Sequence, residues 1–277
     1  MSLPDDHRLA AELATRAGAV LLEIRARLTA EEVPTSLLKH EGDQRSHEFL
    51  MAALAEVRPG DAVLSEEGTA HACHPDRGTT DRTWIIDPVD GTREYSEPPR
   101  TDWAVHVALA VAGEPVVGAV ALPALGCTLS TARPAPVADL PPVPERPRMV
   151  VSRSRPPAEA LAVCDALDGE LVEMGSAGAK AMAVVRGEVD CYVHSGGQFE
   201  WDNCAPAAVA LAAGLHASRI DGSPLTYDHP DPFLPDLVIC RIELVEAVLA
   251  ALLPRYVEAR LFGALLESAA SEHANRQ

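Results

Sequence analysis

One ten-residue stretch constrains this 277-residue chain more than any other. Residues 83–92 read Thr-Trp-Ile-Ile-Asp-Pro-Val-Asp-Gly-Thr, a short apolar segment followed by two carboxylates. The apolar residues predict a buried strand, and Pro88 predicts a bend directly after it, because proline fixes φ and removes a backbone donor. Asp87 and Asp90 would flank that bend and bind one cation beside the N–H groups of the following Gly-Thr. A cluster of carboxylates needs such a cation, and a cation beside N–H donors suits a phosphate.

Two further segments place carboxylates at the edge of predicted elements. Residues 63–68 are a short apolar run that leads into Glu66 and Glu67. Far downstream, Asp202 could cap a helix that begins near Asn203, and a helix N-terminus favours anionic ligands. Oxygen ligands without paired histidine or cysteine favour Mg²⁺, Mn²⁺ or Ca²⁺ over Zn²⁺. Each segment alone is more typical of a turn, a solvated surface pair or a helix cap, but together they predict a metal site.

These residues resemble the inositol monophosphatase superfamily of Mg²⁺-dependent, lithium-sensitive phosphatases. The resemblance covers about residues 8–250 and is carried by Ser65-Glu66-Glu67, the Asp-Pro-x-Asp-Gly-Thr motif and Trp201-Asp202. Residues 90–95 are similar to the bisphosphate nucleotidase branch, especially its actinobacterial members. The segments that extend this similarity are 102–109, 175–180 and 194–198.

The resemblance implies a fold and an activity. The fold would be a layered αβαβα arrangement typical of sugar phosphatases. The activity would be hydrolysis of the 3′-phosphate of 3′-phosphoadenosine 5′-phosphate (PAP) to AMP and phosphate by metal-activated water, in sulfate assimilation. Members of the family are commonly homodimers.

The resemblance also implies roles for individual residues. Two or three Mg²⁺ ions are expected at each site, with Mn²⁺ as an alternative. The expected metal ligands are Glu66, Asp87, the carbonyl of Val89, Asp90 and Asp202. The residues expected to orient the attacking water are Glu66, Thr92 and Asp43. The expected substrate contacts are Gly91, Thr92, Ser176 and Lys180, of which the lysine would pair with the 5′-phosphate.

Two positions depart from the family pattern. Glu41-Gly42 precedes Asp43 where the family often carries a threonine. Tyr95 stands where phenylalanine is common, which keeps the aromatic ring.

Charge and composition limit the classes of ligand and the cellular compartment that we expect for this chain. The net charge of −18 opposes binding of nucleic acid polymers, and an anionic substrate requires bound metal to reverse the local charge. Residues 1–6 lack the basic and apolar regions of a signal peptide, and no uncharged apolar stretch is long enough for a membrane span. We therefore expect a cytoplasmic protein without a membrane partner. Six scattered cysteines without a C-x-x-C pair indicate reduced, mostly buried thiols.

Periodicity and proline content predict two halves. An N-terminal α+β domain would span 1–133 and carry most metal ligands, a proline-rich linker 134–147, and a C-terminal α/β domain 148–277. The expected helices are 7–29, 49–57, 157–167, 177–186 and 206–213. The expected strands are 62–64, 83–86, 103–111, 116–122, 126–131, 149–152, 170–174, 191–194 and 237–241. Because Asp202 comes from the second half, the site should lie between the halves.

Two alternatives to PAP hydrolysis remain open. The same metal chemistry would serve an inositol monophosphatase or a fructose-1,6-bisphosphatase. A non-catalytic nucleotide sensor is a third reading, against which the retained Thr92 argues, since a sensor needs no residue to orient water. Phosphate release from PAP with and without Mg²⁺ separates the three.

Overall fold

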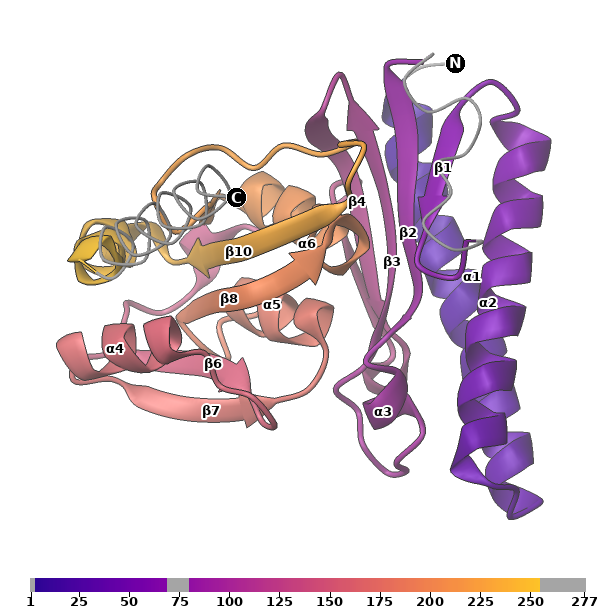
Figure 1. Ribbon diagram of the computed structural model, residues 1–277, viewed down its shortest axis with the longest axis horizontal. Helices are drawn as coiled ribbons and strands as arrows, with labels where there is room; N and C mark the ends of the chain where they lie inside the picture. Colours follow the sequence, from indigo (N-terminus) through magenta and orange to yellow (C-terminus); the bar gives the residue numbers. More distant parts are fainter. Residues whose placement is uncertain (1–2, 69–79, 255–277) are drawn as a thin grey trace, which may run out of the picture.

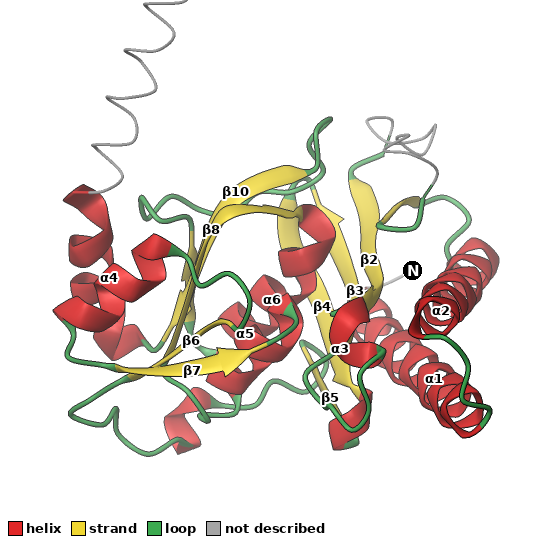
Figure 2. Ribbon diagram, turned by 60° about the horizontal axis from the view of Figure 1, so that its bottom comes forward, coloured by secondary structure: helices red, strands yellow, loops and turns green. Residues whose placement is uncertain are grey.

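The computed structural model describes residues 3–68 and 80–254. Two five-stranded sheets lie face to face with helices between them and on both outer sides (Figure 1). Figure 2 shows the helices α5 and α6 between β8 and β4, with α1 and α2 on one outer side and α4 on the other. The order of layers is therefore the αβαβα arrangement that the family resemblance implies.

Two long helices form the first layer, α1 (Leu3–Ala30) and α2 (Thr35–Val57). Apolar residues of α1 recur every three or four positions and are buried on one face: Leu13, Ala17, Leu21, Ile24 and Leu28. This spacing is what an amphipathic helix requires, and the predicted helix 7–29 is confirmed. The predicted helix 49–57 is too short, because α2 already begins at Thr35 after the extended Pro34. Asp43 consequently lies inside a helix.

The first sheet has the order β1-β2-β3-β4-β5. Its strands are β1 (Ala62–Ser65), β2 (Arg82–Asp90), β3 (Ala104–Val111), β4 (Glu114–Leu122) and β5 (Cys127–Ser130). β1 is parallel to β2, and the other pairs are antiparallel, so the predicted meander is confirmed. The short helix α3 (Thr92–Tyr95) follows β2.

One prediction about β2 is wrong. The strand does not end in a bend after Ile86 but continues through Pro88 to Asp90. Its pairing with β3 shifts register between Asp87 and Asp90, which is a β-bulge. A bulge interrupts the ladder of hydrogen bonds, so the missing N–H of proline is tolerated there.

The second sheet has the order β7-β6-β8-β10-β9. Its strands are β6 (Arg148–Ser152), β7 (Glu170–Met174), β8 (Cys191–Phe199), β9 (His216–Ser218) and β10 (Phe233–Cys240). β7, β6 and β8 are parallel, and β10 is antiparallel to β8 and β9. Its helices are α4 (Ala158–Ala166), α5 (Ala177–Val185) and α6 (Glu200–Ala213). The predicted alternation is confirmed, although β9 was not predicted and β8 runs further than His194.

A single apolar cluster joins the two sheets through the middle helices. It contains Ile85 and Val120 from the first sheet, Met182 and Val209 from α5 and α6, and Ile239 from the second sheet. The proline-rich stretch 134–147 carries only the short 3₁₀ helix Val137–Asp139. The middle layer thus packs on residues from both sides of that stretch.

Two predictions from composition are tested in part. The five cysteines within the described residues are free thiols, and Cys164, Cys191, Cys204 and Cys240 are buried; Cys73 lies outside the described residues. None of the helices within 3–68 and 80–254 combines the length and the apolar character needed to cross a bilayer.

Candidate active site

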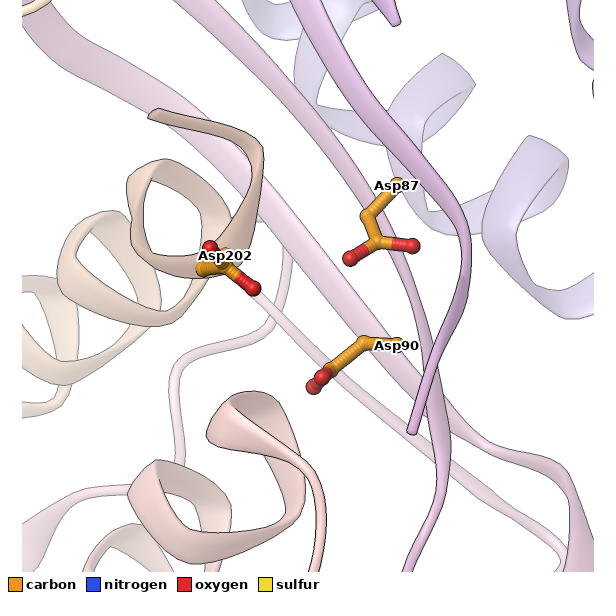
Figure 3. A group of neighbouring side chains, drawn as sticks. All are labelled: Asp87, Asp90 and Asp202. Carbon is orange, nitrogen blue, oxygen red and sulfur yellow. The ribbon is translucent and has the colours of Figure 1, made fainter. Parts of the chain in front are cut away.

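Three carboxylates meet where the first sheet faces α6. Ligand oxygens of Asp87, Asp90 and Asp202 all lie within 4.8 Å of one another. Figure 3 shows Asp87 and Asp90 projecting from the end of β2 toward Asp202 in the first turn of α6. Carboxylates that converge at this distance are suited to holding a hard divalent cation.

The β2 bulge explains why Asp87 and Asp90 face the same side. Residues three apart in a regular strand point to opposite faces of the sheet. Here Asp87 pairs with His106 and Asp90 with Ala104, so β2 has one more residue than β3 across this interval. The extra residue returns Asp90 to the face of Asp87. The N–H of Val89 donates to Asp87 Oδ1 at 3.0 Å and fixes that carboxylate.

Asp202 differs in position from the predicted N-cap. The helix α6 begins at Glu200 with Phe199 as its N-cap, so Asp202 is the third helical residue. Its Oδ2 accepts the N–H of Phe199 at 2.6 Å. A carboxylate at this position commonly reaches back to the N-cap N–H. One oxygen is held in this way, and the carboxylate group still reaches Asp87 and Asp90.

Burial and then mutual repulsion disfavour negative charge on the side of the site formed by Asp87 and Glu66. Burial raises the pKa of Asp87 well above its usual value, and Glu66, Asp90 and Asp202 raise it further. Glu66 is exposed as a whole residue, but its carboxyl group faces Asp87, and burial of that group raises its pKa to about 7. Burial likewise raises the pKa of Asp202 to about 6. All three groups hold their protons to higher pH than ordinary carboxyl groups do, and a bound cation would compensate their negative charge. The donor set therefore fits a divalent metal.

Asp90 has the opposite electrostatic environment. Burial alone would raise its pKa, but the charge and hydrogen bond of His106, together with Ser176, lower it to about 2. Its Oδ2 accepts the hydroxyl of Ser176 and the N–H of Gly178, both at 2.5 Å, and its Oδ1 accepts the N–H of Ala177 at 3.0 Å. Asp90 thus sits on the N-terminus of α5, where the helix dipole favours negative charge.

His106 is a site residue to which the sequence assigned no role. Its Nδ1 lies 2.8 Å from the carbonyl of Trp201, and its Nε2 lies 3.1 Å from Asp90 Oδ2. Burial would lower its pKa, but Asp90 raises it. The signal was available, since one histidine stands in an otherwise apolar strand, Ala104–Val111.

Gly178 allows this contact. A Cβ at Gly178 would lie 2.0 Å from His106 Nε2 and 3.0 Å from Asp90 Oδ2. The first distance is too short for a side chain unless His106 moves, so the backbone of α5 itself closes this end of the site.

Ser176 and Lys180, the predicted substrate contacts, both lie beside Asp90 and are buried. Ser176 also caps α5 by accepting the N–H of Ala179. Lys180 Nζ donates to the carbonyls of Ser176 at 2.5 Å and Gly175 at 3.3 Å, and burial lowers its pKa.

Thr92 connects the metal cluster to α2. Its Oγ1 lies 3.1 Å from the carbonyl oxygen of Val89 and 3.4 Å from Asp43 Oδ1. Burial and the nearby Glu67 raise the pKa of Asp43 to about 7. Gly91 precedes Thr92 with a φ of 82°, a value that glycine adopts freely. The fold therefore brings these predicted residues together from α2, β2 and the start of α3.

The two departures from the family pattern are linked in space. A Cβ at Gly42 would lie 2.5 Å from the Tyr95 ring, so the missing side chain makes room for that ring. Tyr95 donates its hydroxyl to the Leu21 carbonyl at 3.1 Å and packs edge-on against Trp103. Asp43 follows Gly42 directly, so this packing determines where α2 places its carboxylate.

Comparison with known proteins shows the family of this chain. The sequence pattern described as "Inositol monophosphatase family" matches residues 5–253. The chain belongs to the inositol monophosphatase family. The family consists of phosphatases, so the predicted enzyme class, a phosphoric monoester hydrolase, is confirmed.

Two curated members of the inositol monophosphatase family illustrate the similarity. The 3′-phosphoadenosine 5′-phosphate phosphatase of Mycobacterium tuberculosis is 49% identical over 248 residues, covering 85% of this chain and 89% of that protein. The 3′(2′),5′-bisphosphate nucleotidase CysQ of Escherichia coli K12 is 31% identical over 205 residues, covering 69% and 80%.

Solved structures of the family share the fold. CysQ from Bacteroides thetaiotaomicron aligns with a TM-score of 0.67 at 25% identity, covering 86% of this chain and 98% of that one. Inositol monophosphatase from Anabaena (Nostoc) sp. PCC 7120 aligns with a TM-score of 0.69 at 22% identity, covering 92% and 97%.

Proposed function

We propose that this protein hydrolyses the 3′-phosphate of PAP to AMP and inorganic phosphate, with two or three Mg²⁺ ions at its site. The observation that carries the chemistry is the convergence of Asp87, Asp90 and Asp202 within 4.8 Å. The substrate follows from the 49% identity to a protein named for PAP hydrolysis. Phosphoryl transfer needs mainly positioning and charge neutralisation, which a cluster of this kind offers once it holds metal.

The metal ligands in this proposal are Glu66, Asp87, the carbonyl of Val89, Asp90 and Asp202. Bound Mg²⁺ lowers the pKa of a coordinated water and neutralises charge on the phosphoryl oxygens. Mn²⁺ would also suit an all-oxygen site.

The remaining roles fall to groups beside the cluster. Thr92 would align the attacking water, which its Oγ1 contacts with the Val89 carbonyl and Asp43 support. Asp43, with its pKa raised to about 7, can accept a proton near neutral pH. The N–H groups of Gly91 and Thr92 would receive phosphate oxygens. Lys180 adds positive charge behind Asp90, toward the 5′-phosphate.

The proposal extends to the cellular role and the assembly of the protein. We take the enzyme to act in the cytoplasm, in sulfate assimilation, as a lithium-sensitive homodimer. The halves 1–133 and 148–277 would then act as two domains that enclose the substrate between them. Sedimentation and inhibition by LiCl test the dimer and the lithium sensitivity directly.

The deciding experiment measures phosphate release from PAP by EDTA-treated protein, with and without added Mg²⁺. We expect release only with the metal, and AMP as the other product. Binding of PAP without release would instead support the sensor reading, and absence of both would refute the proposal.

The family match favours a second candidate, an inositol monophosphatase. A competition assay with PAP, inositol 1-phosphate and fructose 1,6-bisphosphate separates the two candidates. Preferential release from PAP is expected; faster release from inositol 1-phosphate would favour the second candidate.

A further inference from the structure

An exposed aromatic ring stands close to the acidic cluster. Phe233, the first residue of β10, is 48% exposed. Among the large exposed apolar residues of 3–68 and 80–254 it is the sole aromatic, since the others are leucines and one isoleucine. An accessible ring offers a flat apolar face, which is the surface on which a nucleobase stacks.

The strand pairing connects this ring to the metal cluster. Phe233 lies directly opposite Phe199 in the pairing of β10 with β8. The N–H of Phe199 donates to Asp202 Oδ2 at 2.6 Å. Directly paired residues of antiparallel strands have Cα atoms about 5 Å apart. The Cα atom of Phe233 is therefore one residue pair away from the residue whose N–H holds the Asp202 carboxylate.

Neighbouring groups hold the ring in place. Phe233 meets Phe199 edge-on with 6.1 Å between ring centroids, and Phe199 stacks on Trp201 at 4.8 Å. A Cβ at Gly197 would lie 2.5 Å from the Phe233 ring, so the ring packs over bare backbone. β8, the strand of Gly197, has one residue more than β10 here, because the register shifts between Leu234 and Asp236. A ring fixed in advance loses little entropy when a ligand binds.

The backbone next to the ring borders open space. A Cβ at Gly196 would have no atom within 4 Å, in contrast to Gly197. Both glycines have positive φ, 92° and 99°, which disfavours a side chain at either position. One glycine thus supports the ring, and its neighbour borders open space.

We propose that Phe233 is a specificity-determining residue that stacks against the purine base of the substrate. This inference rests on the proposed nucleotidase function and deepens it. Stacking would favour phosphate esters that carry a base over those of inositol or fructose, which have no aromatic face. The ring would contribute to substrate binding equally in the ground state and the transition state, because it is remote from the reacting phosphorus.

The test compares two substrates on the variant Phe233→Ala. We expect KM for PAP to rise about 10-fold, as for loss of a base-stacking aromatic, with kcat within about twofold of the original. Kinetics with inositol 1-phosphate should not change. Phe233→Trp should keep the low KM for PAP. Leu171→Ala, which removes an equally exposed side chain (48%) from β7, is the matched control and should leave both substrates unaffected.

A binding measurement separates this inference from the proposed function. Calorimetric titration with AMP requires no turnover, and Phe233→Ala should bind AMP about 10-fold more weakly than the original protein. Equal affinity of the two proteins for AMP, or no measurable affinity in either, would overturn the role of Phe233 whatever the turnover of PAP. An equal loss with PAP and inositol 1-phosphate would also overturn it, since the ring would then merely support Asp202.

Discussion

Asp87 and Asp90 lie three residues apart on one strand, yet they are held in opposite ways. Asp87 faces other carboxylates, Glu66 above all, and these raise its pKa further than burial alone. Asp90 accepts three hydrogen bonds from the start of α5 and lies beside His106, so its pKa is lowered. In the proposed site the charge of Asp87 would need a cation to compensate it, whereas protein groups already compensate the charge of Asp90. Two ligands of the same residue type would thus differ in what stabilises their negative charge.

Replacing Asp90, whose charge the protein compensates, should have the largest effect on the free energy of unfolding. Asp90→Asn removes the negative charge that His106 and the N-terminus of α5 face. Removing one partner of a buried pair typically costs about 3 kcal/mol of folding free energy. We expect a cooperative loss of that size in urea unfolding, with and without Mg²⁺. Ser176→Ala, which removes one of the three donors and the cap of α5, should cost about 2 kcal/mol.

Unchanged unfolding free energy in Asp90→Asn would show that the contacts at α5 do not stabilise the fold. A loss seen only with Mg²⁺ would show that metal, and not the contacts at α5, compensates the charge of Asp90, and the contrast with Asp87 would disappear.

Replacing Asp87 should affect activity and not folding. Asp87→Asn is expected to lower phosphate release from PAP at least about 100-fold, equivalent to about 2.7 kcal/mol in the barrier. In EDTA the variant should be at least as stable as the original protein, because a repelled buried carboxylate is gone. Asp139→Asn, at an exposed position, controls for the loss of one charge. Turnover in Mg²⁺ close to that of the original protein would refute the metal site.

Adding a methyl group at Gly42 tests how α2 is positioned. Gly42→Ala should clash with the Tyr95 ring, and overpacking of this kind costs about 2 kcal/mol. Since Asp43 follows directly, kcat should fall more than KM rises. Gly60→Ala is the matched control because no atom lies within 4 Å of its Cβ position. If Gly42→Ala were as stable and active as Gly60→Ala, the link between Gly42 and Tyr95 would be wrong.

The smallest predicted effect is a pH dependence of the metal-free protein. Asp87, Glu66 and Asp202 have folded-state pKa values above their usual range, about 7 for Glu66 and about 6 for Asp202. The folded state therefore binds more protons than the unfolded state from about pH 4 to above pH 7, and stability falls as pH rises through this window. From this site we expect melting in EDTA to occur about 3 °C lower at pH 8 than at pH 6.

Two comparisons isolate that effect. Adding Mg²⁺ should raise the melting temperature more at pH 8 than at pH 6, because the metal binds the deprotonated carboxylates. The dependence on pH should also be weaker in Asp87→Asn. Identical pH profiles for the original protein and Asp87→Asn would contradict the origin assigned here.

The sequence predicted the elements and the acidic residues better than their geometry. Hydrophobic periodicity was enough for α1, the meander of the first sheet and the alternation in the second. The motif around Asp87 and the resemblance it carries identified the acidic residues. The bulge at Pro88 was not predictable, because proline signals a bend equally in a loop and in a strand. The position of Asp202 depends on Phe199 acting as N-cap, which no propensity favours.

Long-range contacts account for the remaining differences. His106 belongs to the site only because β3 pairs with the bulged part of β2 and faces the start of α6. Gly42 and Tyr95 each looked like an isolated departure from a family pattern, and only their contact in space relates them. A histidine in an apolar strand signals a special position, but local sequence does not show which residues either His106 or Tyr95 contacts.

The bare backbone at Gly178 has a consequence for how such a protein can diversify. At Gly178, beside Asp90 and His106, there is no room for one more carbon atom, so selection for a new substrate cannot act there without disturbing the fold. Change is confined to exposed positions around the site, such as Phe233. A lineage built on this scaffold would therefore keep its chemistry while exchanging the molecules on which it acts.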